Sequence, residues 1–234
     1  MSTRRAPGRV ALVLAMMVLV VSCSTSHNPA ATTTTSAGSG ATTTTTTAAG
    51  GSAGPAGPAP TVPGPEGAPV VTSPDLAPAG ATGETIDGIQ CAPIEQLAYH
   101  IHAHLSLFVN GQARAVPYGV GITPPLQLQY VGSVPFVTGG TCIYWLHTHA
   151  ADGILHVESP TANTYTLQNF FDIWHQPLSP TQVGPAQGPV TVFVNGQPSS
   201  QDPRLLILDP HANIQLDVGQ PVVPAQPFTF PSGL

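Results

Sequence analysis

The chain has 234 residues, with five basic and eleven acidic side chains, nine histidines and a formal net charge of −6 at pH 7. All five basic residues are arginine, and only Arg114 and Arg204 lie beyond the first nine positions. Nucleic acids and anionic lipid headgroups are bound through clusters of lysine and arginine, so this composition argues against both as partners of the protein surface.

The N-terminus has the pattern of a secretion signal. Three arginines precede an apolar run at residues 10–21, which is shorter than the roughly 20 residues of a transmembrane helix. The run ends in Leu-Val-Val-Ser-Cys at residues 19–23, which resembles the lipobox of bacterial lipoproteins. The resemblance implies a signal peptide at residues 1–22, two acyl chains on Cys23 and anchoring to the outer face of the cell membrane. The alternative is an ordinary cleaved signal with an incidental cysteine.

Residues 23–85 consist almost entirely of threonine, alanine, glycine, proline and serine. Such a segment buries too little apolar surface to offset the entropy that it loses on ordering. We therefore expect a disordered stalk that connects the lipidated Cys23 to one folded, histidine-rich domain at residues 86–234.

Two cysteines remain in the expected domain, Cys91 and Cys142. In an oxidising compartment an even pair most simply forms a disulfide, which stabilises by about 3–4 kcal/mol in the chain-entropy model. The alternative, a pair of thiolates that binds a metal, is less common outside the cell.

The segment 99–109 predicts the central strand of the domain. His100, His102 and His104 alternate with apolar residues. This period of two is typical of a strand with one face against a core, and here the other face carries three imidazoles.

The rest of the domain predicts a mainly β fold, either a single β-sandwich or a barrel-like sheet. Asn-Gly dipeptides at 110–111 and 195–196 favour hairpin turns, either as two similar hairpins or as the same turn chemistry used twice. One short amphipathic helix is expected after Thr166, with apolar residues at i, i+3, i+4 and i+7 from Leu167 and with Pro177 as its end. Further strands are expected at residues 113–116, 126–131, 141–149, 154–158, 190–194, 205–208 and 214–218.

A second histidine group falls on the hairpin that is expected at residues 141–158. Residues i and i+2 of a strand lie about 6.6–7 Å apart on one face, so two such imidazoles can converge on one ion, whereas i and i+4 are too distant without a bulge. We therefore predict a metal site that combines one histidine pair of the first strand with His147 and His149, with His156 or Glu158 in reserve. The candidate ligands are His100, His102, His104, His147, His149 and His156. The alternative is a hydrogen-bonded histidine face without an ion.

The donor atoms narrow the identity of the metal. All three methionines lie in the expected signal, and the cysteines are expected to be paired, so soft sulfur ligands are missing. Imidazole with an optional carboxylate suits Zn, Cu(II), Ni or Fe and disfavours Cu(I) and blue-copper sites. An open coordination position would allow hydrolytic or oxidative chemistry, with Glu158 or Asp152 as the candidate general base. The sequence contains no Gly-x-Ser-x-Gly, phosphate-loop or His-Glu-x-x-His motif, so no motif indicates which reaction an enzyme would catalyse.

Four motifs carry a resemblance to a protein family: YHIHAH at 99–104, LHTH at 146–149, DGILHVES at 152–159 and TLxxFFDIW at 166–174. With them, the segment from Cys91 to Leu234 resembles an uncharacterised family of bacterial extracytoplasmic, often lipid-anchored proteins. The resemblance implies that location and brings no activity. In that family the His-Thr-His triplet is commonly followed by aspartate, whereas this chain has Ala150, which weakens any role for a carboxylate there.

Three functions are compatible with the sequence. The leading hypothesis is a cell-surface lipoprotein that binds a transition metal through its histidine cluster, for storage, sensing or delivery. The second is a metal-dependent surface enzyme, a hydrolase or an oxidoreductase, that uses the same cluster. The third is a cell-wall or partner-binding module without a metal, whose protein partners the sequence does not name.

Overall fold

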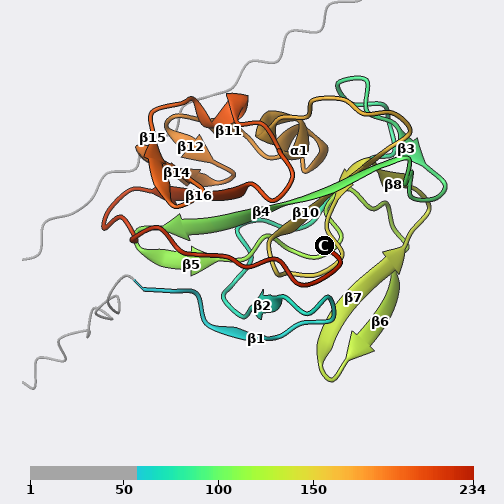
Figure 1. The fold of residues 1–234 in the computed structure, drawn as a ribbon, viewed down its shortest axis with the longest axis horizontal. Helices are drawn as coiled ribbons and strands as arrows, with labels where there is room; N and C mark the ends of the chain where they lie inside the picture. The colour runs from blue at the N-terminus through green and yellow to red at the C-terminus, as the bar shows by residue number, and fades with distance from the viewer. Residues whose placement is uncertain (1–56) are drawn as a thin grey trace, which may run out of the picture. The chain divides into compact units, whose positions relative to one another are not determined.

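The computed structural model describes residues 57–234, which form a mainly β domain with one α-helix in that range (Figure 1). The expected signal peptide, Cys23 and residues 23–56 of the expected stalk lie outside the described residues. Within residues 57–234, no helix has the length and apolar character needed to cross a membrane. The predicted fold class, mainly β with one short helix, is confirmed.

The largest sheet of the described residues is organised around its longest strand, β4 (Tyr99–Val109). The first half of β4 pairs antiparallel with β10 (Ile154–Ser159), and the second half pairs parallel with β16 (Asn213–Val218). Its other strands are β5 (Gln112–Arg114), β9 (Leu146–His147), β14 (Val190–Val194) and β15 (Gln197–Ser199). Because β4 is long enough to pair with two different strands, it places the histidines of its first half beside β10.

Four smaller sheets hold the other strands of residues 57–234. Their strands are β1 (Thr61–Pro63), β2 (Pro69–Val71), β3 (Cys91–Ala92), β6 (Gln127–Val131), β7 (Val134–Gly139), β8 (Ile143–Tyr144), β11 (Leu178–Ser179), β12 (Gln182–Val183) and β13 (Ala186–Gln187). Figure 1 shows the β6–β7 hairpin projecting from the rest of the domain. The sequence predicts β6 but not its partner β7.

The apolar side of β4 faces the main core, as its alternation predicts. Ala103, Leu105 and Leu107 are buried in one cluster that also contains the apolar residues of the helix. The histidines therefore lie on the opposite side of this strand, away from the main core.

The predicted helix is confirmed as α1 (Leu167–Ile173). Its N-cap Thr166 accepts a hydrogen bond from the backbone of Asn169, and all four residues of the predicted apolar stripe are buried. The backbone turns left-handed at His175, where φ is 56°, so the helix ends before Pro177 is reached.

Both Asn-Gly dipeptides form hairpin turns. Asn110 and Gly111 have φ of 50° and 74°, and Asn195 and Gly196 have 51° and 78°. Two consecutive positive φ angles define the type I′ turn that these residues favour. The closing pairs match as well, Val109 with Gln112 and Val194 with Gln197, so the chain contains two similar hairpins.

The domain boundary expected at residue 86 is wrong, because residues 57–85 belong to the folded domain. β1 and β2 form a hairpin in this segment, and Val70 and Leu76 are buried. The backbone also bonds to the domain: Leu76 donates to the carbonyl of Ala115 at 2.9 Å, and the indole of Trp174 donates to that of Pro78 at 2.8 Å. Scattered apolar side chains and backbone hydrogen bonds order this segment on a surface that the rest of the domain supplies.

Two expected strands differ from the structure. Leu205 is the last residue of a 3₁₀ turn, η1 (Pro203–Leu205), and the residues after it bond to the segment before α1, since the amide of Leu208 donates to the carbonyl of Tyr165. The strand expected at 141–149 is divided into β8 and β9 at Trp145, whose carbonyl accepts from the backbone of Glu158. In both places an apolar segment packs against the domain without forming one continuous ladder.

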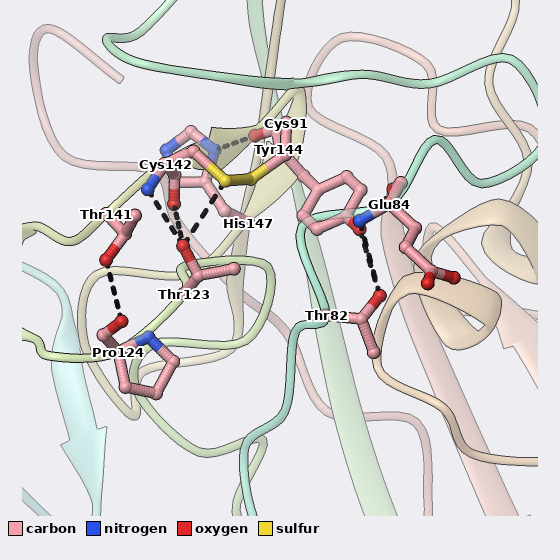
Figure 2. Close-up of a disulfide and its surroundings, with 9 residues drawn as sticks. All are labelled: Thr82, Glu84, Cys91, Thr123, Pro124, Thr141, Cys142, Tyr144 and His147. Atoms are coloured by element: carbon pink, nitrogen blue, oxygen red, sulfur yellow. Dashed lines mark hydrogen bonds between the residues drawn. A yellow bond between two sulfur atoms is a disulfide. The ribbon is translucent and has the colours of Figure 1, made fainter.

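Cys91 and Cys142 form the predicted disulfide, with 5.4 Å between their Cα atoms (Figure 2). The bond connects the strand pair β3–β8, in which Cys91 lies opposite Tyr144. Thr123, from another loop, also holds Cys142 in place. Its hydroxyl donates to the carbonyl of Cys142 at 3.1 Å and accepts from the amide of Cys142 at 2.8 Å. Figure 2 also shows the hydrogen bond between the ring of His147 and the backbone carbonyl of Tyr144, beside the disulfide.

Candidate metal centre

Three adjacent strands bring the histidines together. β10 lies between β4 and β9, and its His156 is directly opposite His102 on one side and His147 on the other. Glu158, two residues further along β10, is opposite His100. Directly opposite residues project from the same face of a sheet, so the register collects these side chains into one cluster.

The cluster is buried although it lies on the polar side of β4. His102, His147, His149 and His156 have at most 5 % of their surface exposed, whereas the side chain of His100 is 37 % exposed. The side chains that shield the cluster from solvent come from outside the large sheet. Glu66, in the β1–β2 turn, contacts His156; Glu95, before β4, contacts His149; and Phe136 of β7 stacks on His149.

Two histidine pairs make close nitrogen–nitrogen contacts. Nε2 of His100 lies 3.0 Å from Nε2 of His102, and Nε2 of His147 lies 3.1 Å from Nε2 of His149. Two ligands bound to one zinc ion at about 2.0–2.1 Å and at a tetrahedral angle are roughly 3.3 Å apart. Both pairs therefore have nearly the spacing that adjacent metal ligands need.

The hydrogens of the second pair can be placed from their partners. Nδ1 of His147 donates to the carbonyl of Tyr144 at 2.8 Å, and Nδ1 of His149 donates to that of Val137 at 2.5 Å. Burial is the main cause that lowers the pKa of both rings, so both are neutral at pH 7. A neutral imidazole whose Nδ1 carries the proton has a bare lone pair on Nε2. Two lone pairs thus face each other across 3.1 Å in a buried site, and a cation would relieve this repulsion.

His156 lies between two carboxylates. Its Nδ1 is 3.3 Å from Oε1 of Glu158, and its Nε2 is 3.2 Å from Oε1 of Glu66. Burial alone would lower the pKa of His156, but the hydrogen bonds and charges of Glu158 and Glu66 outweigh it and raise this pKa to about 9. Without a metal, His156 therefore carries the positive charge of the cluster, and it has to release a proton before a ring nitrogen can bind an ion.

Two sets of four side chains have the spacing to hold an ion. In each set the ligand atoms lie within 4.8 Å of one another, and His156 and Glu158 belong to both. The first set adds His100 and His102, and the second adds His147 and His149. All donors are imidazole nitrogen or carboxylate oxygen, which suits Zn, Cu(II), Ni or Fe(II). Glu158, expected as a candidate base, lies inside both sets of potential ligands.

His104 is not brought into the cluster. Its Nδ1 lies 2.9 Å from Oδ1 of Asn213, its Nε2 lies 3.1 Å from the carbonyl of Asp152, and its ring stacks on Phe228 with centroids 3.5 Å apart. Burial lowers the pKa of His104 to about 4. It is a neutral, hydrogen-bonded core histidine, so its inclusion among the predicted ligands departs from the structure.

The sequence reasoning missed Glu66 and Glu95 as members of the site. Glu66 was assigned to the stalk, where it is the one carboxylate between residues 23 and 74. Glu95 lies in a short loop with no strand or helix pattern. The available signal for Glu66 was its isolation in a neutral segment, in a Pro-Glu-Gly sequence that favours a turn.

Asp152 is a buried carboxyl close to the site. Its Oδ1 accepts from the amide of Ile154 at 3.0 Å, while Oδ2 has no hydrogen-bond partner among the described residues. Burial, followed by the negative charge of Glu66, raises the pKa of Asp152 to about 7. The folded protein therefore holds this proton where the unfolded chain, with a pKa near 3.8, releases it.

This difference predicts a pH-dependent effect of Asp152→Asn in metal-free protein. The wild type loses stability at this residue as pH rises from about 4 to 7, because the folded state binds more protons than the unfolded state. An asparagine keeps the oxygen that accepts from Ile154 and removes the charge. We expect the variant to unfold at the same temperature as the wild type near pH 4 and to gain roughly 1–2 kcal/mol by pH 8. Thermal unfolding in the presence of a chelator measures it, and a pH-independent difference would contradict it.

Comparison with family models gave no match for this chain, and comparisons with curated proteins and with solved structures gave none either.

Proposed function

We propose that the histidine cluster binds a divalent transition-metal ion, and that the protein holds this metal outside the cell, for storage, sensing or delivery. The observation that carries the proposal is the contact between His147 and His149. Both Nδ1 atoms are committed to backbone carbonyls, which fixes the bare Nε2 atoms 3.1 Å apart. Metal-binding histidines are commonly oriented in this way by a bond from the second ring nitrogen.

The charges around the cluster support the same conclusion. Glu158 and Glu66 have lowered pKa values, since their contacts with His156 outweigh the opposite effect of burial. Both are therefore anionic at neutral pH and favour a cation. Oε2 of Glu158 is also buried without a hydrogen-bond partner in the described part of the chain. Unsatisfied buried polar atoms are expected where a ligand is missing.

Metal analysis of protein purified without a histidine tag tests the proposal. We expect tight binding of zinc or another of the candidate metals after equilibrium dialysis. His102→Asn combined with His147→Asn should weaken it at least about 100-fold, because losing even an outer partner of a ligand typically costs 10–100-fold. His175→Asn is the matched control, since His175 is exposed and asparagine tolerates its positive φ.

The outcome that would contradict the proposal is no binding of Zn, Cu(II), Ni or Fe(II) by the folded wild type. The wall or partner-binding module without a metal would then be the remaining function. Equal affinity of the double variant and the wild type would place any bound metal elsewhere.

One observation favours a second candidate function, a metal-dependent surface enzyme. The side chain of His100 is 37 % exposed, so an ion on this side of the cluster is accessible to solvent. Catalytic metal sites keep such an open position, whereas purely structural sites are closed. Binding of azide to the Co(II)-loaded protein, seen as a change in its visible spectrum, would support an enzyme. A spectrum unaffected by azide would support a closed binding site.

The membrane anchor is a separate part of the proposal, supported by the lipobox-like sequence before Cys23. We expect Cys23→Ala to move the protein from the membrane fraction to the soluble fraction, because a second acyl chain is what makes attachment stable. Fractionation and labelling with a radioactive fatty acid measure this. Full retention of the variant in the membrane fraction would show that Cys23 is not the anchor.

A further inference from the structure

The carboxylate of Glu158 faces two different histidine pairs. Its Oε1 lies 3.1 Å from Nε2 of His100, and its Oε2 lies 3.9 Å from Nε2 of His147. These histidines come from β4 and β9, which flank β10 on opposite sides. A carboxylate whose two oxygens point toward separate groups of ligands has the arrangement of a bridging ligand.

One ion does not satisfy both pairs. Atoms on opposite sides of an ion with bonds of about 2.1 Å are at most about 4.2 Å apart. His102 of β4 and His147 of β9 lie opposite His156 on its two sides. The ring of His156 lies between them, with its centroid 4.6 Å from that of His102 and 5.3 Å from that of His147. Accordingly, the two pairs fall into separate ligand sets that share only His156 and Glu158.

The unsatisfied atoms decide between one ion and two. An ion at His100, His102 and Oε1 of Glu158 would leave the facing lone pairs of His147 and His149 as they are. It would also leave Oε2 of Glu158, which has no hydrogen-bond partner in residues 57–234, without one. A second ion at His147 and His149 uses all of these atoms.

Nearby carboxylates reduce the net charge of such a pair of ions. Glu95 lies 3.5 Å from Nε2 of His149 through its Oε1, and its side chain is 34 % exposed, so it can adjust toward the second pair. Glu66 lies 3.2 Å from Nε2 of His156 through its Oε1. With Glu158, three carboxylates surround the cluster, which offsets most of the charge of two divalent ions.

We propose that the cluster binds two divalent transition-metal ions bridged by Glu158, one at His100 and His102 and the other at His147 and His149. His156 completes the coordination of one of them. This inference rests on the proposed metal-binding function and adds to it the number of ions and the role of Glu158. In two-metal sites the ions lie about 3.5–4 Å apart, within the span of one carboxylate.

Zinc stoichiometry of the full chain, measured by mass spectrometry of the metal after equilibrium dialysis, tests the inference. We expect two zinc ions per wild-type chain and two per His175→Asn chain. His100→Asn with His102→Asn should retain one, and so should His147→Asn with His149→Asn. Asparagine suits the second pair because its amide can still donate to the carbonyls of Tyr144 and Val137 while the Nε2 ligand is removed.

Copper tests the bridge itself. Two Cu(II) ions joined by one carboxylate interact magnetically, so the electron paramagnetic resonance signal of the loaded wild type should account for less than its total copper. Glu158→Gln should restore the signal of isolated Cu(II) and weaken the second ion at least about 10-fold. Near-UV circular dichroism checks that each variant is folded. If the double variant of the first pair is not folded, His100→Asn alone, at an exposed position, replaces it, and His149→Asn alone replaces that of the second pair.

The outcomes separate this inference from the proposed function. No metal in the wild type would overturn both. One ion per wild-type chain that either double variant abolishes would overturn the two-ion centre and leave metal binding intact. Two ions whose copper signal is that of isolated Cu(II) in both the wild type and Glu158→Gln would overturn the bridge.

Discussion

Saturation with zinc is expected to raise the unfolding temperature of the metal-free protein by about 8–16 °C. One bound ion, with free metal at about 1,000 times its dissociation constant, contributes about 4 kcal/mol to the folded state, and 1 kcal/mol corresponds to about 2–4 °C in a domain of this size, so a second ion would add to this rise. The structure gives the reason. The facing Nε2 atoms of His147 and His149 are fixed in the folded chain, so the metal binds this state and not the unfolded one.

The control for this stabilisation is the combination of His102→Asn and His147→Asn. Calorimetry with and without a chelator should show that most of the rise is lost in this variant, whose own unfolding temperature without metal stays within a few degrees of the wild type. Retention of the full rise would mean that zinc stabilises the fold from another place. His175→Asn should behave as the wild type throughout, because its side chain is exposed and outside both ligand sets.

The features that the sequence predicted correctly are those set by local pattern. The alternation around His102 identified β4 and its buried side, and the spacing from Leu167 identified α1. The Asn-Gly dipeptides identified two turns, since few other pairs adopt consecutive positive φ angles. The histidine-x-histidine pairs predicted the cluster because strand geometry alone puts i and i+2 on one face.

The features that the sequence did not predict depend on contacts between distant segments. Residues 57–85 have no periodic pattern, and they are ordered by packing on a surface that only the folded domain provides. Glu66 was missed for this reason. His104 satisfies the same alternation as His102, yet its position opposite Ile154 places it beyond the row formed by His156. At that position the ring of His104 hydrogen-bonds to Asn213 and stacks on Phe228, both from the C-terminal part of the chain.

Replacing both cysteines of the disulfide by serine is expected to lower the free energy of unfolding by about 3–4 kcal/mol, or about 6–16 °C in unfolding temperature. The bond joins residues 51 positions apart, so its loss frees a long loop in the unfolded chain. It also secures the pairing of Cys91 with Tyr144, whose carbonyl orients the ring of His147 (Figure 2). We therefore expect zinc affinity to fall by about 10–100-fold as well, which is the usual effect of losing a partner that orients a metal ligand.

Chemical reduction provides an independent check on this coupling between the disulfide and the metal site. A phosphine reductant should lower the unfolding temperature of the wild type to that of the Cys91→Ser and Cys142→Ser double variant and should leave the variant itself unchanged. Zinc affinity, measured after the reductant is removed and the thiols are blocked, should fall in the wild type alone. If stability falls while affinity stays the same, the hydrogen bond from Nδ1 of His147 to Tyr144 persists without the disulfide, because β9 remains paired with β10 through His147 and His156. If both fall together, the disulfide positions a metal ligand as well as stabilising the fold.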